Sequence, residues 1–249
     1  SSAVPASTES KTAAKEATPT EWASSPKARK RACSAKVPRS PEKATSVAGF
    51  FDSVASPTPT PGGGTVSAFV GALAATLPAM VAGLTLGKKK YAAHEEAMKE
   101  VRRKAAALRG RLLGLARKDS EAFEAVLKAR KMAQSTPAEV GAREQAMAAA
   151  DLEAMRVPLE TAQACLEVLE LAVEVAKKGN VNAASDSGVA GLLAHAAAEG
   201  ALLNVEINLK SAGDSADKTD IEMGLQRVRT MLGPLARSCQ DAVHAALSA

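Results

Sequence analysis

The feature that most constrains the fold is a long stretch without charged residues, from 53 to 87. Proline stands at alternate positions of 57–61, where it fixes φ and removes backbone donors, so this lead-in is extended. Three consecutive glycines follow: Gly62, Gly63 and Gly64. Glycines that open a helix leave free N–H groups for a carboxylate, phosphate or oxyanion, although the same pattern also serves as a simple turn. No Gly-Lys-Ser/Thr follows, which excludes a P-loop.

This uncharged stretch is long enough to span a bilayer, so a membrane helix is an alternative. Small residues outnumber the large apolar ones, however, and Pro78 interrupts the middle. Small side chains favour close contact between helices rather than contact with lipid. We therefore expect a buried central helix over 64–87 and no membrane insertion.

Composition favours an all-helical protein. Aromatic residues make up 2% of the chain, whereas strands depend on aromatic and β-branched side chains. No alternation of strand and helix patterns occurs, which excludes a doubly wound sheet. We predict an antiparallel bundle of about five to seven helices. The expected helices cover 46–55, 64–87, 92–133, 137–156, 158–178, 186–209 and 218–247.

The boundaries of several helices have local signals. Pro137 suits a first helical position, whereas Pro158 and Pro234 are expected to kink or restart their helices. Gly179 follows two lysines and is expected to end a helix. Ser185 or Asp186 is the predicted N-cap of the next helix.

The positive charge of the chain is concentrated at its start. Nine of 32 Lys/Arg and four of 27 Asp/Glu lie in residues 1–44, so this segment holds the whole net charge of +5. It has few large apolar residues, so we predict a disordered tail over 1–45 and a helical domain over 46–249. The basic cluster at 25–31 is read as solvated, with nucleic-acid binding disfavoured. The tail is also compatible with a transit-peptide remnant, which leaves the cytoplasm or an organelle matrix as the location.

Cysteine and histidine positions give no metal-binding pattern. The three cysteines are odd in number and none lies in a CxxC pair. The histidines are equally scattered. We therefore expect no metal site, and no cofactor beyond whatever the substrate itself carries.

Three polar residues interrupt otherwise apolar helix faces. Asp119 lies four residues after Leu115 and four before Phe123, so its carboxylate is either buried and paired or functional. Asn204 and Asn208 lie one turn apart on a face that is otherwise apolar. Their amides either bond between helices or face a ligand.

Six segments carry a resemblance to a known family and occur in that family's order. They are FFDSVASPTPTPGGGTVSA, ALAATLPAMVAGLTLGKKKY, KDSEAF, VPLETAQACLEVLELA, GNVNAASDSGVA and EGALLNVEINL. Residues 46–249 resemble the cyclodeaminase/cyclohydrolase family: the C-terminal domain of formimidoyltransferase-cyclodeaminase and the methenyltetrahydrofolate cyclohydrolases of the same fold. The resemblance implies an all-helical homodimer acting on one-carbon units carried by tetrahydrofolate, through a tetrahedral carbon between N5 and N10. The sequence does not separate methenyltetrahydrofolate cyclohydrolase from formiminotetrahydrofolate cyclodeaminase activity; because it carries no transferase domain, the first is slightly preferred.

The resemblance also implies roles for particular residues. Asp119 matches the family's acidic position as a proton relay, and Asp186 is the next acidic residue within a family motif. The expected substrate contacts are Gly62, Gly63, Gly64, Lys88, Lys89, Lys90, Asn204 and Asn208. The three lysines would reach the glutamate tail of the same folate only from an antiparallel partner subunit; otherwise they form a solvated helix end. The alternative function is a catalytically silent dimeric subunit of a larger assembly, anchored by the basic tail.

Overall fold

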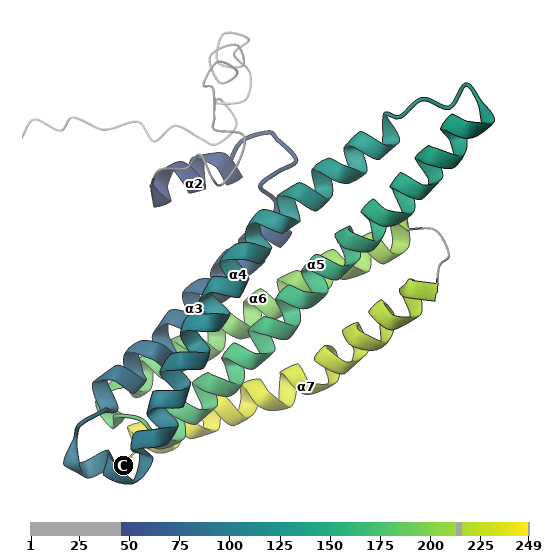
Figure 1. Ribbon diagram of the computed structural model, residues 1–249. Helices are drawn as coiled ribbons and strands as arrows, with labels where there is room; N and C mark the ends of the chain where they lie inside the picture. The colour runs from purple at the N-terminus through teal and green to yellow at the C-terminus, as the bar shows by residue number, and fades with distance from the viewer. Residues whose placement is uncertain (1–45, 213–215, 249) are drawn as a thin grey trace, which may run out of the picture. The chain divides into compact units, whose positions relative to one another are not determined.

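The computed structural model describes residues 46–212 and 216–248, which belong to one compact unit (Figure 1). All regular elements in these ranges are helical, which confirms the predicted all-α class. The α-helices are α2 (Val47–Val54), α3 (Gly63–Thr85), α4 (Glu95–Arg130), α5 (Pro137–Lys178), α6 (Ala184–Ser211) and α7 (Ala216–Leu247). Two 3-10 helices, η2 (Lys89–His94) and η3 (Val181–Ala183), lie between them. The predictions for the tail, 1–45, lie outside the described residues.

Long helices that follow one another in the chain run antiparallel, as predicted. Thr65 at the start of α3 bonds to Asp119 in the second half of α4. Asn208 near the end of α6 bonds to Ala154 in the first half of α5. Helix α3 packs against α4 and α6, while α7 covers α5 and α6 (Figure 1). One end of the bundle therefore gathers the start of α3 with the later halves of α4 and α6.

Small residues let the central helices approach closely. A Cβ atom on Gly71 of α3 would lie 2.5 Å from the Cys165 sulfur of α5. A Cβ atom on Gly191 of α6 would lie 2.6 Å from the Cys239 sulfur of α7. Burial raises the pKa of the Cys165 thiol to about 12, so this side chain is an inert part of the core.

Of the two outcomes predicted for Pro158, a kink or a restart, the restart is wrong. Thr136 caps α5 with the expected capping box, but the helix then continues through Pro158 to Lys178. Proline has no N–H to donate to the carbonyl four residues earlier, that of Ala154. The side-chain amide of Asn208 donates to this carbonyl instead, at 2.6 Å. An amide from a neighbouring helix thus supplies the hydrogen bond that proline removes; Pro234 likewise lies inside a continuous α7.

The predicted N-cap of α6 is also wrong. Helix α6 begins at Ala184, so Ser185 and Asp186 lie inside its first turn. The helical turns begin earlier in the chain, at η3, which the buried Asn180 caps: its side-chain oxygen accepts a hydrogen bond from the Asn182 N–H. The Asn180 N–H donates to the Thr85 hydroxyl at 2.8 Å. This contact ties the start of α6 to the end of α3, and it makes a side-chain cap one turn later unnecessary.

Two helical segments, Gly63–Thr85 and Val181–Ser211, are long and apolar enough to cross a membrane by length and composition alone. In the first segment, 50% of the most apolar part is buried inside the bundle. In the second segment the buried share is 44%. The buried parts belong to the core of the bundle. Their remaining apolar side chains form an outward face of α3 and α6.

Gly179 ends α5 as predicted, but its backbone is not left-handed, so a left-handed turn is not the reason that glycine is needed here. Its φ is −81° and its ψ −177°, which any residue can adopt. A Cβ atom here would instead collide with the Val175 carbonyl and lie 2.9 Å from the Val81 side chain.

We therefore predict that Gly179→Ala lowers the free energy of unfolding by about 1–3 kcal/mol, through overpacking. Gly141→Ala, in the same helix and in open space, should raise it by up to about 1 kcal/mol. Urea denaturation of both variants measures these changes. Equal effects of the two substitutions would contradict the steric explanation.

Candidate functional site

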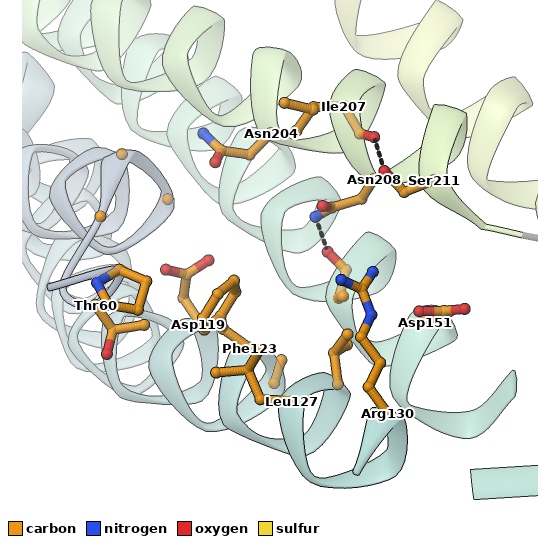
Figure 2. A pocket seen from close by; sticks show the side chains of 17 residues that line it. Thr60, Asp119, Phe123, Leu127, Arg130, Asp151, Asn204, Ile207, Asn208 and Ser211 are labelled. Atoms are coloured by element: carbon orange, nitrogen blue, oxygen red, sulfur yellow. Dashed lines mark hydrogen bonds between the residues drawn. The ribbon is translucent and has the colours of Figure 1, made fainter. Parts of the chain in front are cut away.

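A cavity of about 370 Å³ lies at the end of the bundle where α3 begins. Helices α4, α5 and α6 supply its other walls (Figure 2). The structure brings together six residues predicted from the sequence, which all line this cavity: Gly62, Gly63, Gly64, Asp119, Asn204 and Asn208.

Asp119 is the titratable group at the inner end of the cavity. Its half-buried carboxylate accepts a hydrogen bond from the Thr65 hydroxyl at 2.7 Å and one from the Thr65 backbone. Burial raises the pKa of Asp119 above its ordinary value, and the two bonds from Thr65 oppose this shift in part. No neighbouring cation of the described chain contributes to the shift. Asp119 is therefore not the buried ion-pair partner that the sequence left open.

The glycine turn lets the carboxylate sit directly against the first turn of α3. A Cβ atom on Gly64 would collide with the Asp119 carboxylate, whereas one on Gly63 would make an ordinary contact 3.5 Å from the Asn204 amide. Among the described residues, the N–H groups of Gly63 and Gly64 have no acceptor. They are available to a ligand oxygen, as helix N-termini allow.

Asn204 and Asn208 each combine the two roles that the sequence offered as alternatives, a structural hydrogen bond and a position facing the cavity. Asn204 donates to the Gly200 carbonyl of its own helix at 2.8 Å, and Asn208 makes the bond between helices at Ala154. Both are half-buried and both line the cavity, with Asn204 facing Asp119 across it (Figure 2). Each thus has a structural bond through its nitrogen and an oxygen left for a ligand.

The outer part of the cavity was missed at the sequence level. Apolar side chains of α4 and α6 form its middle, and Arg130, Asp151 and Ser211 form its outer end (Figure 2). Burial raises the pKa of Asp151, and the charge of Arg130 opposes that shift. The spacing from Asp119 to Arg130 is 11 residues, about three helical turns, and this signal places both on one face of α4.

The remaining predicted site residues lie at the other end of the bundle. Lys88, Lys89 and Lys90 are exposed around the start of η2, after the end of α3, and Asp186 lies in the first turn of α6. The 23 residues of α3 separate the lysines from the glycine turn by about 35 Å. Within one subunit the structure does not bring these residues to the cavity, so their functional roles stay predictions.

The cavity gathers the kinds of group that proton transfer uses. A carboxylate with a raised pKa, free helix N–H groups and amide oxygens meet at one end. Across residues 46–212 and 216–248, no three His, Cys, Asp or Glu side chains group as a metal site would require. A raised pKa brings a carboxyl group closer to the range in which it can both accept and donate a proton.

Comparison with known proteins identifies the family. The model of the formiminotransferase-cyclodeaminase family matches residues 46–227, which is most of the chain. The chain belongs to this family. It is 45% identical over 167 residues to a methenyltetrahydrofolate cyclohydrolase of Methylorubrum extorquens, covering 67% of this chain and 80% of that one.

Other members of the family agree with this assignment. The mouse formimidoyltransferase-cyclodeaminase is 34% identical over 174 residues, 70% of this chain and 32% of the mouse protein, so the chain spans about a third of that relative. The crystal structure of formiminotetrahydrofolate cyclodeaminase from Thermotoga maritima superposes with a TM-score of 0.72 at 33% identity. That match covers 80% of this chain and 96% of the other.

The role of Thr65 leads to a direct prediction. Thr65→Val keeps the shape of the side chain but removes the hydroxyl that bonds to the ionised carboxylate, so the pKa of Asp119 should rise further. A ¹³C NMR titration of the Asp119 carboxyl carbon measures this change. Thr76→Val, at a hydroxyl that bonds within α3, should leave the pKa unchanged. An unchanged or lower pKa in Thr65→Val would contradict this description of the site.

Proposed function

We propose that this protein is a tetrahydrofolate one-carbon enzyme, a methenyltetrahydrofolate cyclohydrolase, and that Asp119 is its proton relay. The observation that carries the proposal is the position of Asp119: half-buried, with a raised pKa, bonded to Thr65 and packed against Gly64 in the first turn of α3. The names of the family members support the substrate class. The silent structural subunit is not favoured, because the relatives that match this chain are named as folate enzymes.

The reaction adds water to the cationic carbon that bridges N5 and N10. Ionised Asp119 accepts a proton from the attacking water, which gives the neutral tetrahedral intermediate. Protonated Asp119 then donates to N5 as the bond between carbon and N5 breaks. The hydroxyl proton passes to solvent, leaving a formyl group on N10. In this proposal the N–H groups of Gly63 and Gly64, which have no acceptor among the described residues, bind the oxygen of that group.

Cyclodeaminase activity is the second candidate, because the Thermotoga and mouse relatives carry that name. Its tetrahedral carbon also lies between N5 and N10 but carries an amino group: N10 attacks the formimino carbon, and the protonated amino group leaves as ammonia when the methenyl bridge forms. The higher identity to the cyclohydrolase, 45% against 34%, supports hydrolysis as the main activity. Rates on methenyl- and formimino-tetrahydrofolate separate the two.

Asp119→Asn should lower kcat by roughly two to four orders of magnitude, because an amide keeps the shape but cannot exchange a proton near neutral pH. The loss of the methenyl absorbance band measures the rate. Stability should not fall at neutral pH. The raised pKa means that the folded state binds the proton more readily than the unfolded state, so ionised Asp119 costs stability above its folded pKa.

Asp186→Asn is the matched comparison, because Asp186 lies outside the cavity. It should retain a kcat within a few-fold of the unsubstituted protein. Wild-type turnover by Asp119→Asn would overturn the role of Asp119. A loss confined to Asp186→Asn would place the reaction at the other end of the bundle.

We further propose that the protein is a homodimer formed through the outward face of α3 and α6. On α3 this face carries apolar residues at the three- and four-residue spacing of a helix–helix seam. They are Val66, Val70, Leu73, Leu77, Met80 and Leu84, and α6 adds the exposed Val189, Leu192 and Leu203. Leu73 and Leu192 are 52% and 60% exposed, more than an isolated subunit is expected to leave uncovered along two adjacent helices. An antiparallel partner is also what the predicted substrate role of Lys88–Lys90 requires.

Leu73→Glu should therefore shift the protein to a monomer, since it puts a charge into an apolar contact. Light scattering after size-exclusion chromatography measures the mass. Leu113→Glu provides the control, because Leu113 is 47% exposed on α4, a helix that is not part of the proposed face. A dimer that persists in Leu73→Glu, or dissociates equally in Leu113→Glu, would contradict this interface.

A further inference from the structure

We infer that Arg130 binds a glutamate carboxylate of the folate, and that apolar residues in the middle of the cavity hold the benzoyl ring. The inference rests on the proposed function, because it assigns the rest of the same substrate to the same cavity. It also gives the glutamate a partner within one subunit, which Lys88–Lys90 do not provide.

The residues that carry the inference form one line along α4. Asp119, Phe123, Leu127 and Arg130 recur at intervals of three or four, so they share a face, and all four line the cavity. Figure 2 shows this order, with Asp119 at one end, Phe123 and Leu127 between, and Arg130 at the other. Ile207 of α6 lies opposite as a further apolar wall. The cavity thus changes from polar to apolar to charged along its length.

The spacing selects the end of the substrate that Arg130 meets. The 11 residues from Asp119 to Arg130 span about 16 Å along the helix. A benzene ring and an amide separate the one-carbon bridge from the glutamate carboxylates, about 10 Å at ordinary bond lengths. An arginine side chain that leans inward covers the remainder. The amino-pyrimidinone edge of the pterin lies only about 5 Å from N5, too close to reach Arg130.

Charge supports the same assignment. Within the described residues, Arg130 is the one cation that lines the cavity, and it is exposed at the outer end. Asp151 lies close enough for the charge of Arg130 to act on its carboxyl group. Guanidinium has five N–H donors, so Arg130 can keep Asp151 on one edge and take a substrate carboxylate on the other. Asp151 then orients the arginine and leaves its other edge open for the substrate carboxylate.

The test compares two substrates, methenyltetrahydrofolate and methenyltetrahydropteroate, which lacks the glutamate. The unsubstituted protein should favour the folate in kcat/KM by roughly 10- to 100-fold, the range for a charge-assisted hydrogen bond. Arg130→Met should lose this preference through a higher KM for the folate, with kcat and the pteroate reaction little changed. Arg109→Met, at an exposed arginine of the same helix away from the cavity, should keep the full preference.

Arg130→Lys is the control for misfolding. Lysine keeps the positive charge but lacks the paired donors of a guanidinium, so this variant should retain part of the preference for the folate. Equal losses on both substrates in Arg130→Met, or a preference that survives it, would overturn the inference while leaving the proposed function in place. If the unsubstituted protein hydrolyses neither substrate, the proposed function fails, and this inference with it.

Discussion

The contact on which the site depends is the hydrogen bond from Thr65 to Asp119 across Gly64. It joins the first turn of α3 to the second half of α4, and it exists only because glycine leaves room for the carboxylate. The same contact sets the chemistry. Burial raises the pKa of Asp119 while Thr65 limits the rise, so the carboxyl group is suited to both proton acceptance and donation. The same carboxyl group thereby joins two helices and is the titratable group that faces the cavity.

Much of this arrangement follows from sequence periodicity. The positions of Asp119, Asn204 and Asn208 on apolar helix faces, together with the glycine turn, predicted residues that the fold brings to one cavity. Antiparallel packing brings these residues together because the start of one helix lies beside the end of the next. Sequence resemblance supplied the family, which the comparisons confirm. The spacing from Asp119 to Arg130 on α4 was also present in the sequence, but a single exposed arginine gives no signal until its cavity is known.

What the sequence did not reveal depends on contacts between distant segments. Pro158 is a helix breaker by local rules, yet α5 continues through it, and the amide of Asn208, 50 residues later, donates to the carbonyl that the proline leaves without its usual donor. Ser185 and Asp186 are good caps locally, but Asn180, tied to Thr85, starts the helix earlier. In both cases a side chain from another helix satisfies a backbone group that local propensity treats as unpaired.

The most direct test of the account is the pH dependence of kcat/KM for methenyltetrahydrofolate, corrected for uncatalysed hydrolysis and set beside the NMR titration of Asp119. If Asp119 must be ionised to accept a proton from water, the rate should fall as pH falls through the pKa of Asp119. The kinetic inflection should then lie above the usual range of an aspartate and coincide with the NMR titration. A rate that stays constant while Asp119 titrates would contradict the account.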